Sequence, residues 1–152
     1  MKRLPRWIAT LGPVGSAPIT PATLGSFATV IVGYLLPVPD LRIALAILVV
    51  GFFIAVWAAG EAEKTLGHDA GPIVIDEVIG QSIALLGAPH TWWAFTTCFL
   101  LFRLFDIWKP LGAQEAQQLP GGWGVVTDDV IAGVVALIAF QLGRIAVMRI
   151  GA

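Results

Sequence analysis

Five carboxylates lie at the edges of long apolar stretches, where an acidic side chain needs a partner: Asp76, Glu77, Asp106, Asp128 and Asp129. An ionisable group at membrane depth costs at least about 2.5 kcal/mol on insertion scales. A divalent cation is the natural partner, because Mg²⁺ prefers hard oxygen ligands and needs only one or two carboxylates when a phosphate and water complete its shell. Acids of this kind, with no converging His or Cys cluster, favour phosphate chemistry assisted by Mg²⁺.

Two further segments carry groups that suit a phosphate. Arg103, Asp106 and Lys109 are spaced three apart, so on a helix they form one stripe with a carboxylate between two cations. Such a stripe can hold a metal and a phosphate oxygen side by side. Residues 15–26 are rich in glycine, proline and hydroxyl side chains, and backbone amides of such a segment can cradle a phosphate where a helix begins.

Small residues follow three of the acids at helical spacing. Gly80 follows Asp76 by four positions, Ala132 follows Asp128, and Gly133 follows Asp129. Residues four apart share a helix face, and small residues let a neighbouring helix approach closely. We therefore expect these acids to point into a crowded space between helices and not into lipid.

The elements that position these residues are predicted to be membrane helices. Hydrophobic residues make up 57% of the 152-residue chain and charged residues 12%, with a mean hydropathy of +0.85, whereas soluble domains carry about 25% charged residues. The pattern predicts an all-α fold, a compact polytopic membrane bundle in a single domain over residues 1–152. About five membrane or membrane-embedded helices are expected, over residues 23–37, 41–62, 73–87, 91–108 and 128–149, the first and third being short for a full span.

Charge places the acids on one side of the predicted bundle. With the N-terminus inside, six cations (Lys2, Arg3, Arg6, Lys64, Arg103 and Lys109) lie on the inner side and three (Arg42, Arg144 and Arg149) on the outer side. This bias agrees with the positive-inside rule. Asp76 and Glu77 then open the third helix, Asp106 ends the fourth, and Asp128 with Asp129 opens the fifth. We read the basic N-terminus as retained, because Gly12, Pro13 and Gly15 interrupt the apolar core that a signal peptide needs.

Simpler structural roles remain open for each feature taken alone. Asp128 and Asp129 could cap a helix start, Arg103 could form an internal ion pair with Asp106, and Lys109 could be a snorkelling anchor. His68 alone fits a solvated loop histidine. A net charge of −1 gives no basic footprint for nucleic acid, and the single cysteine, Cys98, allows no internal disulfide or thiolate metal cluster.

Four motifs in this order resemble those of the phosphatidylglycerophosphatase A family, over about residues 10–140. They are SAPITPATLGS (16–26), GHD (67–69) with IDEVIG (75–80), FRLFDIWKP (102–110) and GGWGVVTDDVIAG (121–133). Two departures stand out. Ala22 replaces the usual glycine in the first motif, and Leu111-Gly112-Ala113 lacks the bulky and basic residues common after the third.

The resemblance implies hydrolysis of phosphatidylglycerophosphate to phosphatidylglycerol and phosphate, with Mg²⁺, at the cytoplasmic face of the bacterial inner membrane, in phospholipid synthesis. Asp76, Glu77, Asp128 and Asp129 are expected to hold the metal, and Asp106 to orient Arg103 or join the metal shell. Expected phosphate or substrate contacts are Arg103, Lys109, Ser16, Thr23, Ser26 and His68.

Other classes of membrane protein remain as alternatives. A proton- or cation-coupled transporter also uses intramembrane carboxylates, although it predicts acids near the middle of the membrane. A non-catalytic assembly factor predicts that the acids can be replaced without loss of a reaction. A phospholipid alcohol-transferase would need an Asp-x-x-Asp-Gly motif, which the sequence lacks.

Overall fold

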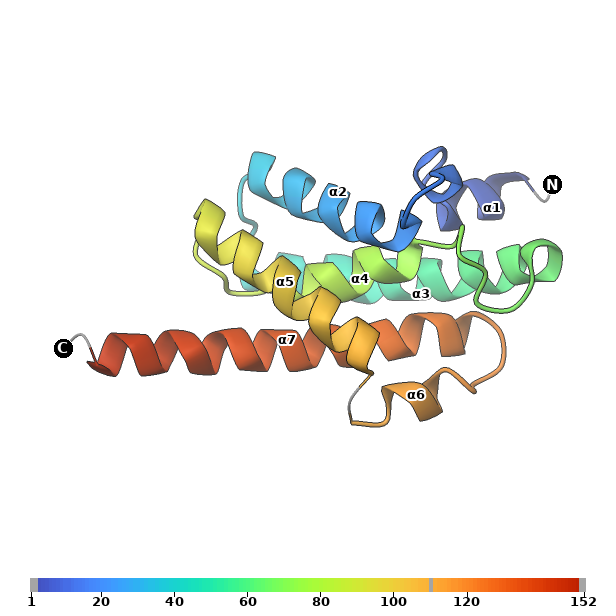
Figure 1. Ribbon diagram of the computed structural model, residues 1–152. Coiled ribbons are helices and arrows are strands. Elements are labelled where there is room, and N and C mark those ends of the chain that lie inside the picture. Colours follow the sequence, from blue (N-terminus) through green and yellow to red (C-terminus); the bar gives the residue numbers. More distant parts are fainter. Residues whose placement is uncertain (1–2, 110, 151–152) are drawn as a thin grey trace.

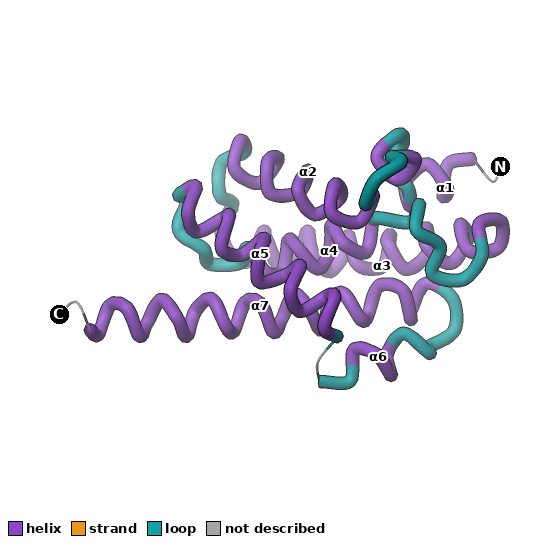
Figure 2. The backbone as a smooth tube through the Cα atoms, in the orientation of Figure 1, coloured by secondary structure: helices purple, strands orange, loops and turns teal. Residues whose placement is uncertain are grey.

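Seven α-helices and one short 3-10 helix form the computed structural model, which describes residues 3–109 and 111–150 and holds no strand in those ranges (Figures 1 and 2). The α-helices are α1 (Arg3–Ala9), α2 (Pro21–Leu35), α3 (Leu41–Leu66), α4 (Ile75–Ala84), α5 (Trp92–Trp108), α6 (Ala113–Ala116) and α7 (Gly122–Ile150), and the 3-10 helix η1 spans Val14–Ser16. The predicted all-helical fold is confirmed. The five predicted helices correspond to α2, α3, α4, α5 and α7, whereas α1 and α6 were not predicted.

Helix α4 lies at the centre of the bundle and packs against α2, α3, α5 and α7 (Figure 1). Its apolar and small residues explain these contacts. Ile79 lies 3.2 Å from the position of a Cβ built on Gly51 of α3. Val74, just before α4, lies 3.1 Å from a Cβ built on Gly25 of α2. A helix of only 10 residues is about 15 Å long, so its neighbours surround it on most sides.

Glycines on α4 and α7 bring these two helices into backbone contact. A Cβ added to Gly133 would lie 2.3 Å from the carbonyl oxygen of Gly80, and a Cβ added to Gly80 would lie 2.6 Å from the carbonyl oxygen of Asp129. Neither position has room for a side chain without movement of the backbone. The expected close approach beneath Asp76 and Asp129 is therefore confirmed.

Helix α7 begins at Gly122, six residues earlier than the predicted start at residue 128, which is wrong. Packing explains the difference. A Cβ on Gly122 would lie 2.0 Å from the carbonyl oxygen of Val56 in α3, so this glycine allows α7 to pack closely against α3. A pair of adjacent glycines, Gly121 and Gly122, usually indicates a turn. The prediction that Asp128 and Asp129 open the helix is also wrong. Asp129 lies about 10 Å along α7 from its first residue, and a helix-capping role for this pair does not apply.

Two helices, α3 and α7, are long and apolar enough to cross a membrane. Their lengths of 26 and 29 residues correspond to about 39 and 43 Å, against a hydrocarbon core of about 30 Å. Many of their large apolar side chains are exposed, among them Ile47, Phe53 and Trp57 on α3 and Ile138 and Leu142 on α7. These features indicate a membrane-associated protein. The predicted five membrane helices are not established by length, since α2 and α5 are shorter and α4 is about half a span.

Two predictions fall on residues outside the described ranges. Pro110 is the last residue of the FRLFDIWKP motif, and Lys2 was counted among the inner cations. Within the described part, α5 ends at Trp108, and Lys109 follows with a left-handed backbone conformation (φ 49°).

We expect Gly133→Ala to destabilise the fold, because its methyl group would push α7 away from α4. Overpacking of this kind costs about 1–3 kcal/mol. Gly143→Ala on the same helix is the matched control, since nothing lies within 4 Å of its added Cβ and alanine favours a helix by about 1 kcal/mol over glycine. Thermal unfolding in detergent should show a lower midpoint for Gly133→Ala and an unchanged or higher one for Gly143→Ala. Equal midpoints would contradict the close contact.

Candidate active site

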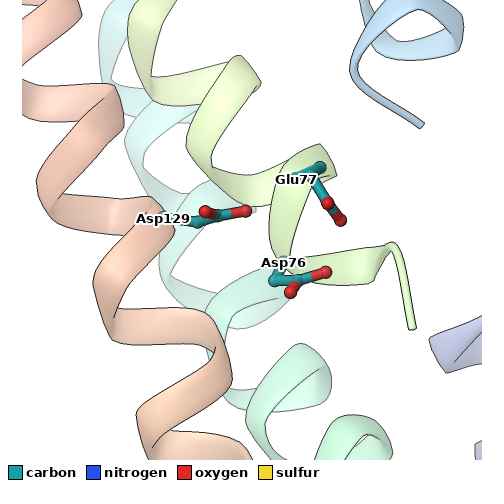
Figure 3. Close-up of side chains that lie close together, drawn as sticks. All are labelled: Asp76, Glu77 and Asp129. Atoms are coloured by element: carbon teal, nitrogen blue, oxygen red, sulfur yellow. The ribbon is translucent and has the colours of Figure 1, made fainter. Parts of the chain in front are cut away.

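Three buried carboxylates from two helices converge at one end of the bundle. Asp76 and Glu77 stand in the first turn of α4, and Asp129 reaches toward them from α7 (Figure 3). One oxygen of each carboxylate lies within 4.8 Å of the others. All three side chains are buried, with residue exposures of 6%, 7% and 4%. Like charges at this spacing repel strongly, so the arrangement requires protons or a cation.

The carboxylate oxygens of this cluster fit a divalent cation. Asp76 Oδ1, Glu77 Oε2 and Asp129 Oδ2 are buried and have no hydrogen-bond partner. Three converging oxygen donors are what Mg²⁺ prefers, and a bound cation would remove the cost of burying these charges.

A cleft of about 280 Å³ opens over the cluster. One lysine, Lys109, lines it, together with six acidic residues: Asp69, Asp76, Glu77, Asp106, Asp128 and Asp129. A phosphate group is itself an anion, so a cleft of this charge would repel it. The cleft becomes compatible with a phosphate when a cation offsets the carboxylates.

Two ion pairs neutralise part of this charge. Arg103 Nη1 lies 2.8 Å from Asp106 Oδ2 within α5. Lys109 Nζ lies 2.6 Å from Asp128 Oδ2, so it joins the end of α5 to α7. Burial lowers the pKa of Lys109, but the hydrogen bond and the negative charge of Asp128 outweigh this effect and leave the pKa above its usual value. Lys109 is therefore fully charged at neutral pH.

These pairs differ from the stripe expected along one helix. The left-handed conformation of Lys109 ends α5 before that residue, and its side chain pairs with α7 instead of continuing the row of Arg103 and Asp106. Asp128, expected among the metal ligands, bonds to Lys109 and also accepts a hydrogen bond from the backbone N–H of Asp129 at 3.1 Å. Asp76, Glu77 and Asp129 thus form the group that the structure brings together, with Asp128 beside it.

Not all of the residues predicted to contact the phosphate or the substrate line the cleft. Ser26 is fully buried, and its Oγ lies 3.5 Å from Arg103 Nη1. Ser16, Thr23 and His68 are not among the residues that line the cleft, and His68 Nδ1 lies 2.5 Å from Glu63 Oε1. Their roles stay predictions. Ala22, which replaces the family's usual glycine, is helical and lines the cleft, while the left-handed residue of this turn is Thr20.

Asp69 lines the cleft although the sequence did not single it out as a site residue. Its backbone has a positive φ of 47°, and its N–H donates to Glu63 Oε1 at 3.0 Å. Its carboxylate accepts a hydrogen bond from Gln117 Nε2, which joins this loop to the segment after α6. Its position beside His68 in the second motif was the feature of the sequence that could have identified Asp69 as a site residue.

Comparison with known proteins identifies the family of this chain. The sequence model of the phosphatidylglycerophosphatase A family matches residues 7–144. A Bacteroides thetaiotaomicron protein, named provisionally as a phosphatidylinositol-3-phosphatase, is 39% identical and covers 95% of this chain and 98% of its own. Phosphatidylglycerophosphatase A of Escherichia coli is 34% identical over 80% of this chain and 73% of its own, and that of Haemophilus influenzae is 36% identical over 78% and 75%. No solved structure matches the chain.

The family match extends across every helix that contributes to the cleft, from α2 to the part of α7 that carries Asp128 and Asp129. The chain therefore belongs to the phosphatidylglycerophosphatase A family and is a phosphatase.

Proposed function

We propose that this protein hydrolyses phosphatidylglycerophosphate to phosphatidylglycerol and inorganic phosphate, with Mg²⁺, as a step of phospholipid synthesis. The family and the two relatives named phosphatidylglycerophosphatase A support the substrate. The observation that carries the Mg²⁺ requirement is the convergence of the three buried carboxylates of Asp76, Glu77 and Asp129, one oxygen of each lying within 4.8 Å of the others.

In this proposal the residues of the cleft, together with Arg103, which pairs with Asp106 of its lining, divide the work by charge. Asp76, Glu77 and Asp129 hold the metal, with Asp128 at its side. When bound, Mg²⁺ would polarise the phosphoryl oxygens and favour ionisation of an attacking water. Lys109 and Arg103 supply positive charge for the phosphate that departs. Asp128 and Asp106 fix these two cations in place through the ion pairs at 2.6 and 2.8 Å.

The surroundings of the cleft suit a substrate that stays in the bilayer. Ile107 lines the cleft and is 74% exposed. Leu104 and Leu24, on α5 and α2, are also exposed. A phosphorylated headgroup can then enter the cleft while its acyl chains remain against these apolar side chains, in lipid. A soluble phosphate ester would gain nothing from this surface.

We further propose that α2, α3, α4, α5 and α7 are embedded in the bacterial cytoplasmic membrane as a multi-pass bundle. The cleft would then face the cytoplasm. Two observations support this placement. The exposed surfaces of α3 and α7 are apolar, and the chain reverses direction between successive members of this set (Figure 1). Lys64, Arg103 and Lys109 therefore lie toward the cleft end, and Arg42 and Arg144 toward the other.

The first test is phosphate release from two lipids, phosphatidylglycerophosphate and phosphatidylinositol 3-phosphate, in detergent micelles. We expect release from phosphatidylglycerophosphate, its loss with a chelator and its return with added Mg²⁺. Full activity in chelator would contradict the metal requirement. Faster release from phosphatidylinositol 3-phosphate would reassign the lipid, in line with the name of the Bacteroides relative.

Asp129→Asn should reduce phosphate release by about 1,000-fold or more. The amide keeps the size of the side chain but removes a metal ligand that supplies several kcal/mol of transition-state stabilisation. Glu61→Gln is the matched control, since Glu61 pairs with Lys64 at the same end of the bundle and does not line the cleft. Normal turnover in Asp129→Asn would contradict the site, whereas Glu61→Gln should retain full turnover.

Lys109→Met should lower both stability and activity, and the two effects can be separated. Removing one partner of a partly buried ion pair leaves Asp128 uncompensated, at a cost of up to about 3–5 kcal/mol. The double variant Lys109→Met/Asp128→Asn should recover most of the lost unfolding temperature. Its phosphate release should stay at least about tenfold below that of the unmodified protein, because the charge that faces the phosphate is still missing. Full recovery of activity would limit Lys109 to a structural role.

A further inference from the structure

Gln81 is the polar side chain whose burial the proposed chemistry leaves unexplained. It is fully buried in α4, and neither Nε2 nor Oε1 has a hydrogen-bond partner. An unsatisfied buried amide costs about 1–3 kcal/mol. An apolar residue of the same size would avoid this cost, so the amide needs a function.

The helical rotation of α4 shows which neighbours Gln81 faces. Ile79 faces α3 at Gly51, and Gly80 faces α7 at Gly133. Because each residue turns about 100° from the last, Gln81 faces the remaining neighbours, α2 and α5. Ser26 and Arg103 meet between these two helices, at 3.5 Å.

Glu77 shares this face, because it precedes Gln81 by one turn. The side chain of a helical residue leans toward the helix N-terminus and covers the preceding turn. Gln81 is thereby placed one turn from Glu77, whose Oε2 is also buried without a partner. A buried donor without an acceptor and a buried acceptor without a donor thus lie on adjacent turns of one helix face.

We infer that Gln81 is a positioning residue for the metal site: a rotation of its side chain would let its amide N–H donate to the unpartnered Oε2 of Glu77, one turn earlier, and hold the other carboxylate oxygen toward Asp76 and Asp129. Carboxylates that bind metals are commonly oriented by a second hydrogen bond, and its loss weakens metal affinity about 10–100-fold. This inference rests on the proposed function, since it requires that Glu77 binds a cation.

The variant Gln81→Met distinguishes a positioning role from a purely structural role by its affinity for Mg²⁺. Methionine has a similar length and no polar atoms, so it removes the unsatisfied amide. Both roles predict that, without Mg²⁺, Gln81→Met unfolds at the same temperature as the unmodified protein or higher. Only a positioning role predicts that the same variant also binds Mg²⁺ more weakly.

The test measures the Mg²⁺-induced rise in unfolding temperature, titrated in detergent without substrate, for three proteins. The unmodified protein sets the reference affinity. Ser82→Ala is the control, because Ser82 is the next residue of α4 and lines the apolar groove beside α2 and α3 and not the cleft. We expect Gln81→Met to need at least about tenfold more Mg²⁺ for half of the rise, and Ser82→Ala to match the reference.

The outcomes separate this inference from the proposed function. Equal Mg²⁺ affinity in Gln81→Met and the unmodified protein would overturn the positioning role and leave the metal site intact. No Mg²⁺-dependent rise in the unmodified protein would overturn the metal site, and the role of Gln81 with it. As a second readout, phosphate release by Gln81→Met should recover at high Mg²⁺, since the ligands themselves remain. Failure to recover would also contradict the inference.

Discussion

The contact between Gly80 and Gly133 sets the position of the groups in the cleft. Asp76 stands one turn before Gly80 on α4, and Asp129 stands one turn before Gly133 on α7. With no side chains between them, the two backbones approach until a Cβ on Gly133 would lie 2.3 Å from the carbonyl oxygen of Gly80. The carboxylates of the preceding turn are then close enough to share one cation. Any larger residue at this contact would separate the helices and the ligands together.

Charge balance then determines what the cleft can bind. Asp106 is paired with Arg103, Asp128 with Lys109, and Asp69 with the amide of Gln117. Asp76, Glu77 and Asp129 remain, each with an oxygen that is buried and unpartnered. Burying three carboxylates without compensation is costly. In the proposed function, a divalent cation would offset most of this charge and make the acidic cleft compatible with a phosphate.

The short helix α4 can carry two of the three clustered acids, Asp76 and Glu77, because longer helices flank it. Helices α3 and α7 present apolar side chains outward along most of their lengths, so the solvent that suits them is lipid. The polar groups lie at one end, where the first turn of α4, the end of α5 and the second turn of α7 meet. In the proposed membrane placement, a phosphorylated lipid headgroup would meet the protein at the depth of these ends, so the apolar exterior and the acidic cleft would serve one substrate.

The sequence by itself determined the helical class, the five main helices, the acids of the cleft apart from Asp69, and the small residues beneath three of them. These follow from local patterns, since charge-free stretches, spacings of four and the motif order need no knowledge of distant contacts. Tertiary structure decided the start of α7, because Gly122 is helical through its contact with Val56, and composition alone suggests a turn there. It also decided that Lys109 pairs with Asp128 and not along its own stripe, since a left-handed residue ends α5 at that point. The membership of the cluster and the place of Asp69 in the cleft depend on how separate segments meet. Packing fixes the distances between segments, and the spacing of residues within one segment carries no information about those distances.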